Sequence, residues 1–338
     1  MNFHTSIQIT HEFDEFVVMK TPHSLVDNVD IGYRHIARTL YRHYEDEFDW
    51  IVVIFNISAE QQQWRKSDVK ARCVLVRNSI AGDGAEDVDV GKLYGSPSRL
   101  KSVIVLPTKE PLIEGFILHE LMHTWVDESS GTVLPTDYPG HWGFSSVNGK
   151  LGGFKKETLE LVRDRVYAVG SFSPTGARLH DGGYGALELY LAGWIPKQEV
   201  PNILVAENVK WPVKIRDEWI WTIQAVEGFE AERITTWTID QIVDRIGERV
   251  PNASESQKHF RMATVVVENE DFPFKLDDIA YFQQQIDLFS RPESILHLNE
   301  IVRKFHNFWD ATGGRATISA DMASAKIPDN SVVSVKDD

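Results

Sequence analysis

The chain has 338 residues, of which 42% are hydrophobic and 11% aromatic, a composition that suits a packed globular protein of one large or two smaller domains. Fifty acidic residues against 35 Lys and Arg give a formal net charge of −15. A surface of that sign repels nucleic-acid phosphates and anionic membranes. No apolar run approaches the roughly 20 residues of a membrane span. We therefore expect neither nucleic acid nor a membrane as a partner.

The cysteine content and the N-terminus bear on location. The single cysteine, Cys73, cannot form an internal disulfide, and its apolar surroundings are typical of a buried structural residue. Residues 1–10 lack the basic head and the apolar stretch of a signal peptide. The sequence as it stands predicts a cytoplasmic protein, with secretion as the alternative if a longer precursor loses an export signal.

The N-terminal third shows a helical pattern followed by strand patterns. Residues 23–48 carry a stripe of apolar side chains at helical spacing, which predicts an amphipathic helix. Short runs rich in β-branched residues then predict three buried strands, at 51–55, 73–76 and 103–106. From 112 to about 127, apolar residues face almost every direction, which indicates a buried helix.

The rest of the chain mixes helical and strand patterns. Thr238 is a predicted helix N-cap, because its hydroxyl can accept from a free amide of the first turn. The pair Gly313-Gly314 predicts a helix end. Beyond it the composition is small and polar, which predicts a disordered tail. The expected elements are helices at 186–192, 239–246, 276–290 and 293–311, a hairpin at 211–231 and a strand at 264–268.

The motif that carries chemistry is His119-Glu120-Leu121-Met122-His123. Two histidines four apart on a helix stand one turn apart on one face, where both can bind one zinc ion at about 2.0–2.1 Å. The ion lowers the pKa of a bound water, and Glu120 can take its proton as a general base. With 12 histidines in the chain, a chance H-E-x-x-H has a probability of roughly three in a hundred. We predict His119 and His123 as zinc ligands.

The sequence does not determine the third zinc ligand. Metzincins carry a third histidine soon after the second, and residues 124–129 contain none, so that pattern is absent. His141 is our first candidate, because the glycines around it allow close backbone approach; a surface loop histidine is the alternative. Glu188 is the second candidate, either as a ligand of the gluzincin type or as a buried carboxylate that orients a metal-bound histidine.

The residue that stabilises the oxyanion is also open. Tyr190 is the predicted choice, and His180 and Tyr184 are the other candidates, because each carries a polar hydrogen near the apolar helix at 186–192. A tyrosine flanked by leucines more often serves the core.

The chain resembles a group of bacterial metallopeptidase-like proteins. These share an H-E-x-x-H-x-W helix, a His-Trp loop that leads to a Leu-Gly-Gly turn, and a Leu-Glu-Leu-Tyr-Leu-x-Gly helix. The resemblance implies zinc and peptide-bond hydrolysis. The matching pieces here are 49–53, 119–125, 141–142, 151–153, 187–193 and 312–316.

We expect an α+β fold. A zincin-like catalytic domain at 1–200 would pack a mixed sheet on the buried His119 helix, a mixed α/β part at 201–318 would close the cleft, and 319–338 would be disordered. The expected function is zinc-dependent hydrolysis of a peptide or amide bond. The alternatives are a zinc enzyme that acts on a small-molecule amide or a biosynthetic intermediate, and a non-catalytic zinc-binding protein.

Overall fold

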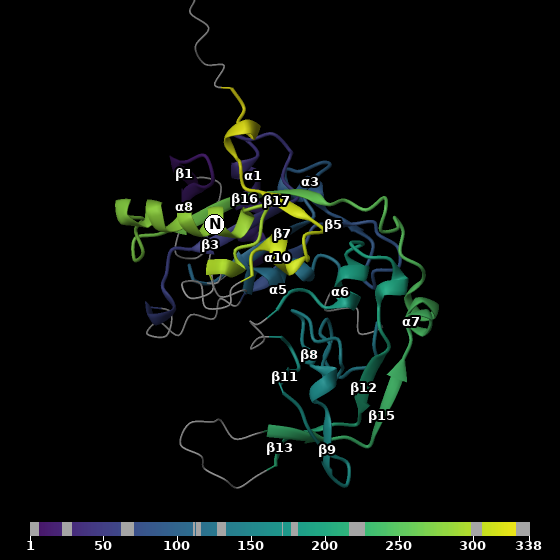
Figure 1. Ribbon diagram of the computed structural model, residues 1–338. Coiled ribbons are helices and arrows are strands. Elements are labelled where there is room, and N and C mark those ends of the chain that lie inside the picture. Colours follow the sequence, from purple (N-terminus) through teal and green to yellow (C-terminus); the bar gives the residue numbers. More distant parts are fainter. Residues whose placement is uncertain are drawn as a thin grey trace, which may run out of the picture.

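A central sheet with helices on both faces stands above a smaller part made mainly of short strands, so the fold is mixed α+β (Figure 1). The computed structural model describes residues 7–21, 29–61, 71–110, 112, 116–126, 133–170, 172–176, 182–215, 227–298 and 306–328.

The central sheet has seven strands. Its inner strands run parallel, whereas the two edge strands are antiparallel to their neighbours. The strands predicted at 51–55, 73–76, 103–106 and 264–268 are all present, and the last begins earlier than predicted. The order is β1 (Gln8–Glu12), β2 (Val17–Lys20), β16 (His259–Glu268), β3 (Trp50–Phe55), β7 (Ser102–Leu106) and β4 (Arg72–Leu75), with β17 (Thr317–Ser319) also paired to β16.

The two faces of the sheet bury two different cores, because side chains alternate along each strand. On β3, Trp50 and Val52 contribute to the core that contains α5 (Phe116–Met122), α6 (Ala186–Leu191), α8 (Leu276–Ser290) and α10 (Phe308–Ala311). Ile51 and Val53 contribute to the opposite core, which includes residues of α1 (Val29–Leu40). The sheet is therefore the middle of three layers.

Most predicted helices are present, and two differ in extent. The helices α6, α7 (Ile239–Ile246) and α8 agree with prediction, and Thr238 caps α7 by accepting from the Gln241 amide. Among the described residues, α5 ends at Met122 and α1 at Leu40, whereas the predicted helices extend to about 127 and to 48. None of the described helices combines the length and the apolar character needed to cross a bilayer.

The single helix predicted at 293–311 is wrong. The described part of this stretch contains a short 3-10 turn, η5 (Leu296–Leu298), and then α10. Asn307 separates them, because its backbone is extended (ψ 179°) and its side chain accepts from the Asp310 amide at 2.7 Å, which makes it the N-cap of a new helix.

The smaller part is built from three antiparallel sheets. The hairpin predicted at 211–231 is confirmed as the pairing of β13 with β14. A bridge between Ser145 and Val205 joins the loop that contains His141 to this part. The sheets are β13 (Lys210–Lys214), β14 (Glu227–Glu230), β10 (Val166–Ala168) and β9 (Glu160–Arg163); β12 (Ile203–Glu207) with β15 (Arg233–Trp237); and β8 (Gly153–Phe154) with β11 (Phe172–Ser173).

The predicted boundary at residue 200 does not match the fold. Strand β16 comes from the C-terminal half but lies between β2 and β3, so the central sheet cannot form from residues 1–200 alone. The disorder predicted from residue 319 is wrong for 319–328. Met322 and Ala325 are buried against the core that contains α1, and the Met322 amide donates to the Asp14 carbonyl at 2.8 Å.

Asp83 is a fully buried carboxylate in the loop after β5 (Arg77–Asn78). Its oxygens accept from Asn78 Nδ2 at 3.1 Å and from the Ala85 amide at 3.0 Å. Burial nevertheless raises the pKa of Asp83 to about 7, from an ordinary 3.8. The folded state thus holds a proton that the unfolded state has lost, so this group's contribution to stability falls as pH rises from about 4 to about 7.

We therefore predict that Asp83→Asn changes the pH dependence of stability. The variant should gain in free energy of unfolding relative to the wild type as pH rises from 5 to 8, because a neutral amide has no proton to lose. Urea unfolding at a series of pH values measures this difference. If the free energy of unfolding changed with pH in the same way in the two proteins, the raised pKa of Asp83 would be contradicted.

Candidate metal centre

The helix α5, which carries the H-E-x-x-H motif, is fixed to the core at both ends. At its C-terminal end, Thr124 Oγ1 accepts from Trp50 Nε1 at 3.1 Å and lies 2.8 Å from Ser102 Oγ, so it bonds to both β3 and β7. At its other end, the buried hydroxyl of Tyr184 donates to the Leu118 carbonyl at 2.9 Å. These bonds fix where the two motif histidines point.

The three predicted histidine ligands lie together. His119 and His123 come from α5, and His141 comes from the loop that leads into the smaller part. One nitrogen of each lies within 4.8 Å of the corresponding nitrogens of the other two. The ring centroids are 4.9 to 5.3 Å apart. The cluster could hold a metal ion.

Main-chain carbonyls determine which nitrogen of each ring faces the cluster. A carbonyl oxygen can only accept, so a neutral imidazole whose Nδ1 contacts one carries its proton there and has a lone pair on Nε2. All three histidines have such a contact. The accepting carbonyls belong to Lys150 for His119 (2.8 Å), Val126 for His123 (2.7 Å) and Pro139 for His141 (2.8 Å).

The spacing of the Nε2 atoms fits a tetrahedral metal ion. His119 Nε2 and His123 Nε2 are 3.2 Å apart. With both protons on Nδ1, neither Nε2 can donate to the other, so two lone pairs face each other. Two nitrogens bound to one zinc at about 2.0–2.1 Å in tetrahedral geometry are about 3.3 Å apart. A cation between the rings would relieve this contact.

The electrostatic surroundings keep the first ligand neutral. Burial lowers the pKa of His119 well below its ordinary value of 6.5, and the neighbouring His123 and His141 lower it further. The bond to the Lys150 carbonyl acts in the opposite direction but is the smaller effect. Metal binding needs the neutral ring, so this environment suits a ligand.

Glu188 is fully buried on α6 and accepts four hydrogen bonds. Burial raises its pKa, and the donors partly oppose that shift. The Gly149 backbone approaches it closely, since a Cβ at Gly149 would lie 2.2 Å from the carboxylate. The donors are Trp142 Nε1 (2.8 Å) and the amides of Lys150 (2.9 Å), Leu151 (2.8 Å) and Gly185 (2.8 Å).

The two predicted third ligands have different surroundings. Glu188 is not part of the histidine cluster, whereas His141 is. Glu188 instead holds the amide of Lys150, whose carbonyl accepts from His119, and the indole of Trp142, which follows His141. Of the two roles considered for Glu188, the geometry matches a carboxylate that orients metal ligands.

The structure describes three of the other predicted site residues, Glu120, Tyr190 and Tyr184. Glu120 is buried on α5 between the two ligands. The hydroxyl of Tyr190 accepts from the Arg249 amide at 3.4 Å, and its role at an oxyanion stays a prediction. Tyr184 bonds to Leu118 as described above, so its hydroxyl supports the helix. His180 lies outside the described residues.

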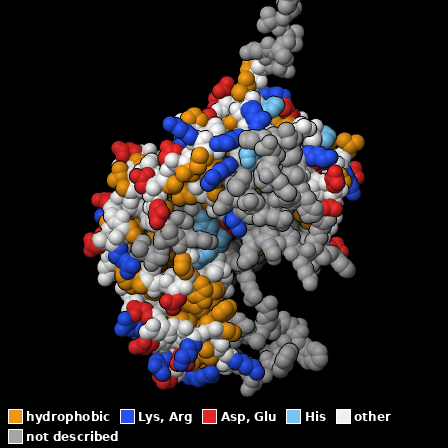
Figure 2. Space-filling view, turned by 180° about the vertical axis from the view of Figure 1, so that it is seen from behind, with side chains coloured by type: hydrophobic (Ala, Val, Ile, Leu, Met, Phe, Trp, Pro, Cys, Tyr) orange, Lys and Arg blue, Asp and Glu red, His pale blue; other side chains and the backbone are white. Residues whose placement is uncertain are grey.

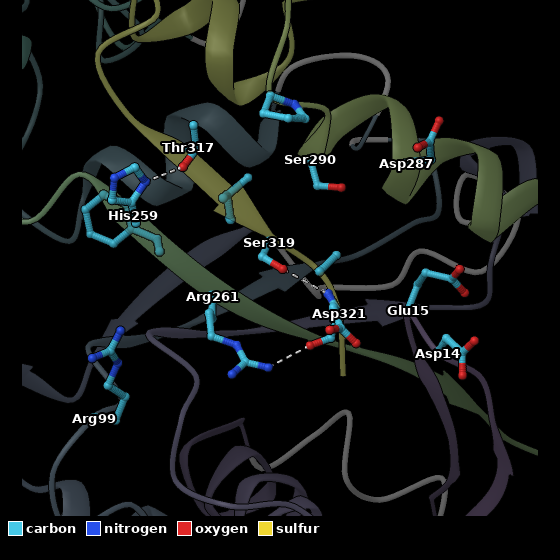
Figure 3. Close-up of a pocket in the computed structure, with 14 residues that line it drawn as sticks. Asp14, Glu15, Arg99, His259, Arg261, Asp287, Ser290, Thr317, Ser319 and Asp321 are labelled. Atoms are coloured by element: carbon cyan, nitrogen blue, oxygen red, sulfur yellow. Dashed lines mark hydrogen bonds between the residues drawn. The ribbon is translucent and has the colours of Figure 1, made fainter. Parts of the chain in front are cut away.

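A cavity of about 780 Å³ lies elsewhere, between β16, β17 and α8 (Figure 3). None of the three clustered histidines lines it. Two of its polar side chains have partners of their own: His259 Nδ1 lies 2.8 Å from Thr317 Oγ1, and Arg261 donates to the main-chain carbonyl of Asp321 at 2.9 Å.

No family model, no curated protein and no solved structure matches this chain. The site therefore has to be interpreted from its own geometry.

Sequence reasoning missed the groups that orient the ligands. The carbonyls of Lys150, Val126 and Pro139 carry no side-chain signal, because any residue supplies a carbonyl. The turn that contains Lys150 did have a signal in Gly149 and Gly152, which permit the close approach of Glu188 and a backbone with φ of +114° at Gly152.

We predict that Glu188→Gln weakens both the fold and the metal site. All four partners of Glu188 are donors, so the new amide NH₂ must face at least one of them in a dry interior. The free energy of unfolding should fall by about 1–3 kcal/mol, and zinc affinity by roughly 10–100-fold. Urea unfolding and zinc competition with a chelator measure the two effects.

Asp83→Asn is the matched control for this variant, because it changes another fully buried carboxylate outside the histidine cluster. It should leave zinc affinity unchanged. If Glu188→Gln lost stability but bound zinc as tightly as the wild type, Glu188 would serve folding alone.

Proposed function

We propose that the protein is a zinc-dependent hydrolase that cleaves peptide bonds, with Glu120 as general base. The observation that supports the proposal is the convergence of three imidazole nitrogens, two of them 3.2 Å apart on a helix where a buried glutamate, Glu120, follows His119 in the chain. A bound zinc ion would polarise a carbonyl group and lower the pKa of a water molecule towards 7. The chain's own residues supply the rest of the chemistry.

His119, His123 and His141 would hold the ion through Nε2. Their Nδ1 protons stay on main-chain carbonyls, which fixes both the tautomer and the tilt of each ring. Glu120 would accept the proton of the attacking water and pass it to the leaving amine. Its 5% exposure keeps bulk water from competing for that proton.

The number and type of ligands favour a catalytic site over a structural one. Closed structural zinc sites have four protein ligands, often cysteines, whereas catalytic sites have three and leave a position for substrate or water. Within the described residues the cluster contains three histidines and no carboxylate or thiolate. The one cysteine, Cys73, belongs to β4 and is not part of it.

Metal binding is the first prediction from this proposal. The purified protein should contain close to one equivalent of zinc, and His119→Ala and His141→Ala should each remove most of it, because each deletes one of three ligands. Elemental analysis after dialysis measures the content. His259→Ala is the control, since His259 contacts Thr317 outside the cluster and should leave the zinc in place. Zinc-free wild-type protein would end the proposal.

Catalysis is the second prediction. Glu120→Gln should retain zinc and lose about 10²–10⁴-fold in kcat/KM on a peptide library, because glutamine cannot accept the proton. The matched control is Glu199→Gln, a glutamate on the 3-10 turn η4 (Lys197–Glu199), which should leave the rate unchanged. Cleavage that survives Glu120→Gln would remove Glu120 from the mechanism. A zinc-loaded protein that cleaves small amides but no peptide would favour a small-molecule hydrolase.

A further inference from the structure

A row of aromatic side chains crosses the smaller part, starting at the loop that carries His141. The rings are in contact step by step: Tyr138 lies 5.8 Å from Phe144, Phe144 lies 4.8 Å from Phe172, and Phe172 lies 6.0 Å from Trp211, measured between ring centroids. We call these four residues the aromatic strip.

The strip is joined to the candidate metal centre by the main chain. The His141 amide donates to the Tyr138 carbonyl at 3.0 Å, so the third ligand and the first ring of the strip belong to one tight turn. Gly143 completes that turn with a φ of +51°, and a Cβ there would lie 2.9 Å from the Tyr138 ring. The turn therefore fixes the position of Tyr138 relative to His141.

The strip has a buried base and an accessible outer face. Phe144 is buried and packs on Phe229 at 5.1 Å. Tyr138 and Phe172 are half-buried, and Trp211 is 39% exposed. Figure 2 shows apolar side chains on the surface next to a group of histidines near the centre of this face. Aromatic rings that are already fixed by packing offer apolar contact area to a ligand and lose little side-chain entropy when the ligand binds.

One hollow beside His141 is too small for a bulky group. A hollow lined by Val126, Val133, Tyr138 and His141, among others, has a volume of only about 10 Å³. That volume admits one water at most. This hollow therefore cannot take a large side chain of a substrate held at the histidines, whereas the aromatic strip begins at Tyr138, which lines the same hollow.

We propose that the aromatic strip is the specificity surface of the site and binds an aromatic or large aliphatic side chain next to the scissile peptide bond. This inference rests on the proposed function. The occupant follows from the continuity of the strip with His141, since a peptide placed at the three Nε2 atoms would continue over Tyr138 towards Phe172 and Trp211. The burial of one such side chain is worth at least about tenfold in affinity.

The test measures binding separately from turnover. Zinc-loaded, full-length Glu120→Gln is titrated with fluorescent peptides that differ only in one residue, either Phe, Leu, Gly or Asp, and binding is followed by anisotropy. We expect the Phe and Leu peptides to bind at least about tenfold more tightly than the Gly and Asp peptides. Adding Trp211→Ala or Phe172→Ala should remove most of that preference.

Leu276→Ala is the control, because Leu276 is an 80% exposed leucine on α8, outside the strip. It should keep the full preference. Circular dichroism will show whether each variant folds. Because two different residues of the strip are substituted, the test still holds if one of the two variants fails to fold. Equal binding of all four peptides would overturn the inference. So would a dimer that dissociates in Trp211→Ala, because the strip would then be a contact between two copies.

The two proposals fail in different ways. If wild-type protein cleaves peptides without preference for Phe or Leu, the strip has no role in specificity and the hydrolase proposal stands. If wild-type protein cleaves no peptide but Glu120→Gln binds Phe and Leu peptides selectively, the strip is a peptide-binding surface and the proposed hydrolysis is wrong.

Discussion

Three hydrogen bonds from histidine Nδ1 atoms to main-chain carbonyls are the constraint on which the site depends. Each bond fixes a proton on the outer nitrogen of a ring, which leaves the inner nitrogen with a lone pair. Without these bonds, His119 and His123 could share a proton between their Nε2 atoms and satisfy each other. With them, the 3.2 Å approach of the two atoms is unfavourable unless a cation lies between them.

Glu188 explains how the chain maintains one of these bonds, that of His119 to the Lys150 carbonyl. A buried carboxylate is costly, and four donors at 2.8 to 2.9 Å offset that cost. The donors come from three separate places: the start of α6, the turn at Lys150, and Trp142 beside His141. One side chain therefore fixes the carbonyl that orients His119 and the neighbour of the third ligand. Its position in the interior, with both oxygens accepting from donors, favours a role as a support for the candidate ligands over that of a ligand.

The parts of this molecule that were predictable from sequence are those set by local periodicity. The spacing of His119 and His123 implies one helix face, and the apolar run at 51–55 implies a buried strand. The helix break at Asn307 was not predictable in this way, because it depends on a side-chain cap that competes with an otherwise helical pattern. The role of Glu188 remained open for a similar reason, since burial and long-range donors distinguish a ligand from a support and neither is encoded in spacing.

The two halves of the chain contribute different parts of the structure around the candidate metal centre. Strand β16, from the second half, completes the core against which α5 packs, so the candidate ligands His119 and His123 stand on a helix supported by the central sheet. His141 instead belongs to a loop bridged to β12 in the smaller part. The same loop contributes Trp142 and Leu151 to the core that contains α5, so the packing that places His141 beside the other two histidines is that of the central core. Because Tyr138 and His141 belong to one turn, this packing also sets where the aromatic strip begins relative to the candidate metal centre.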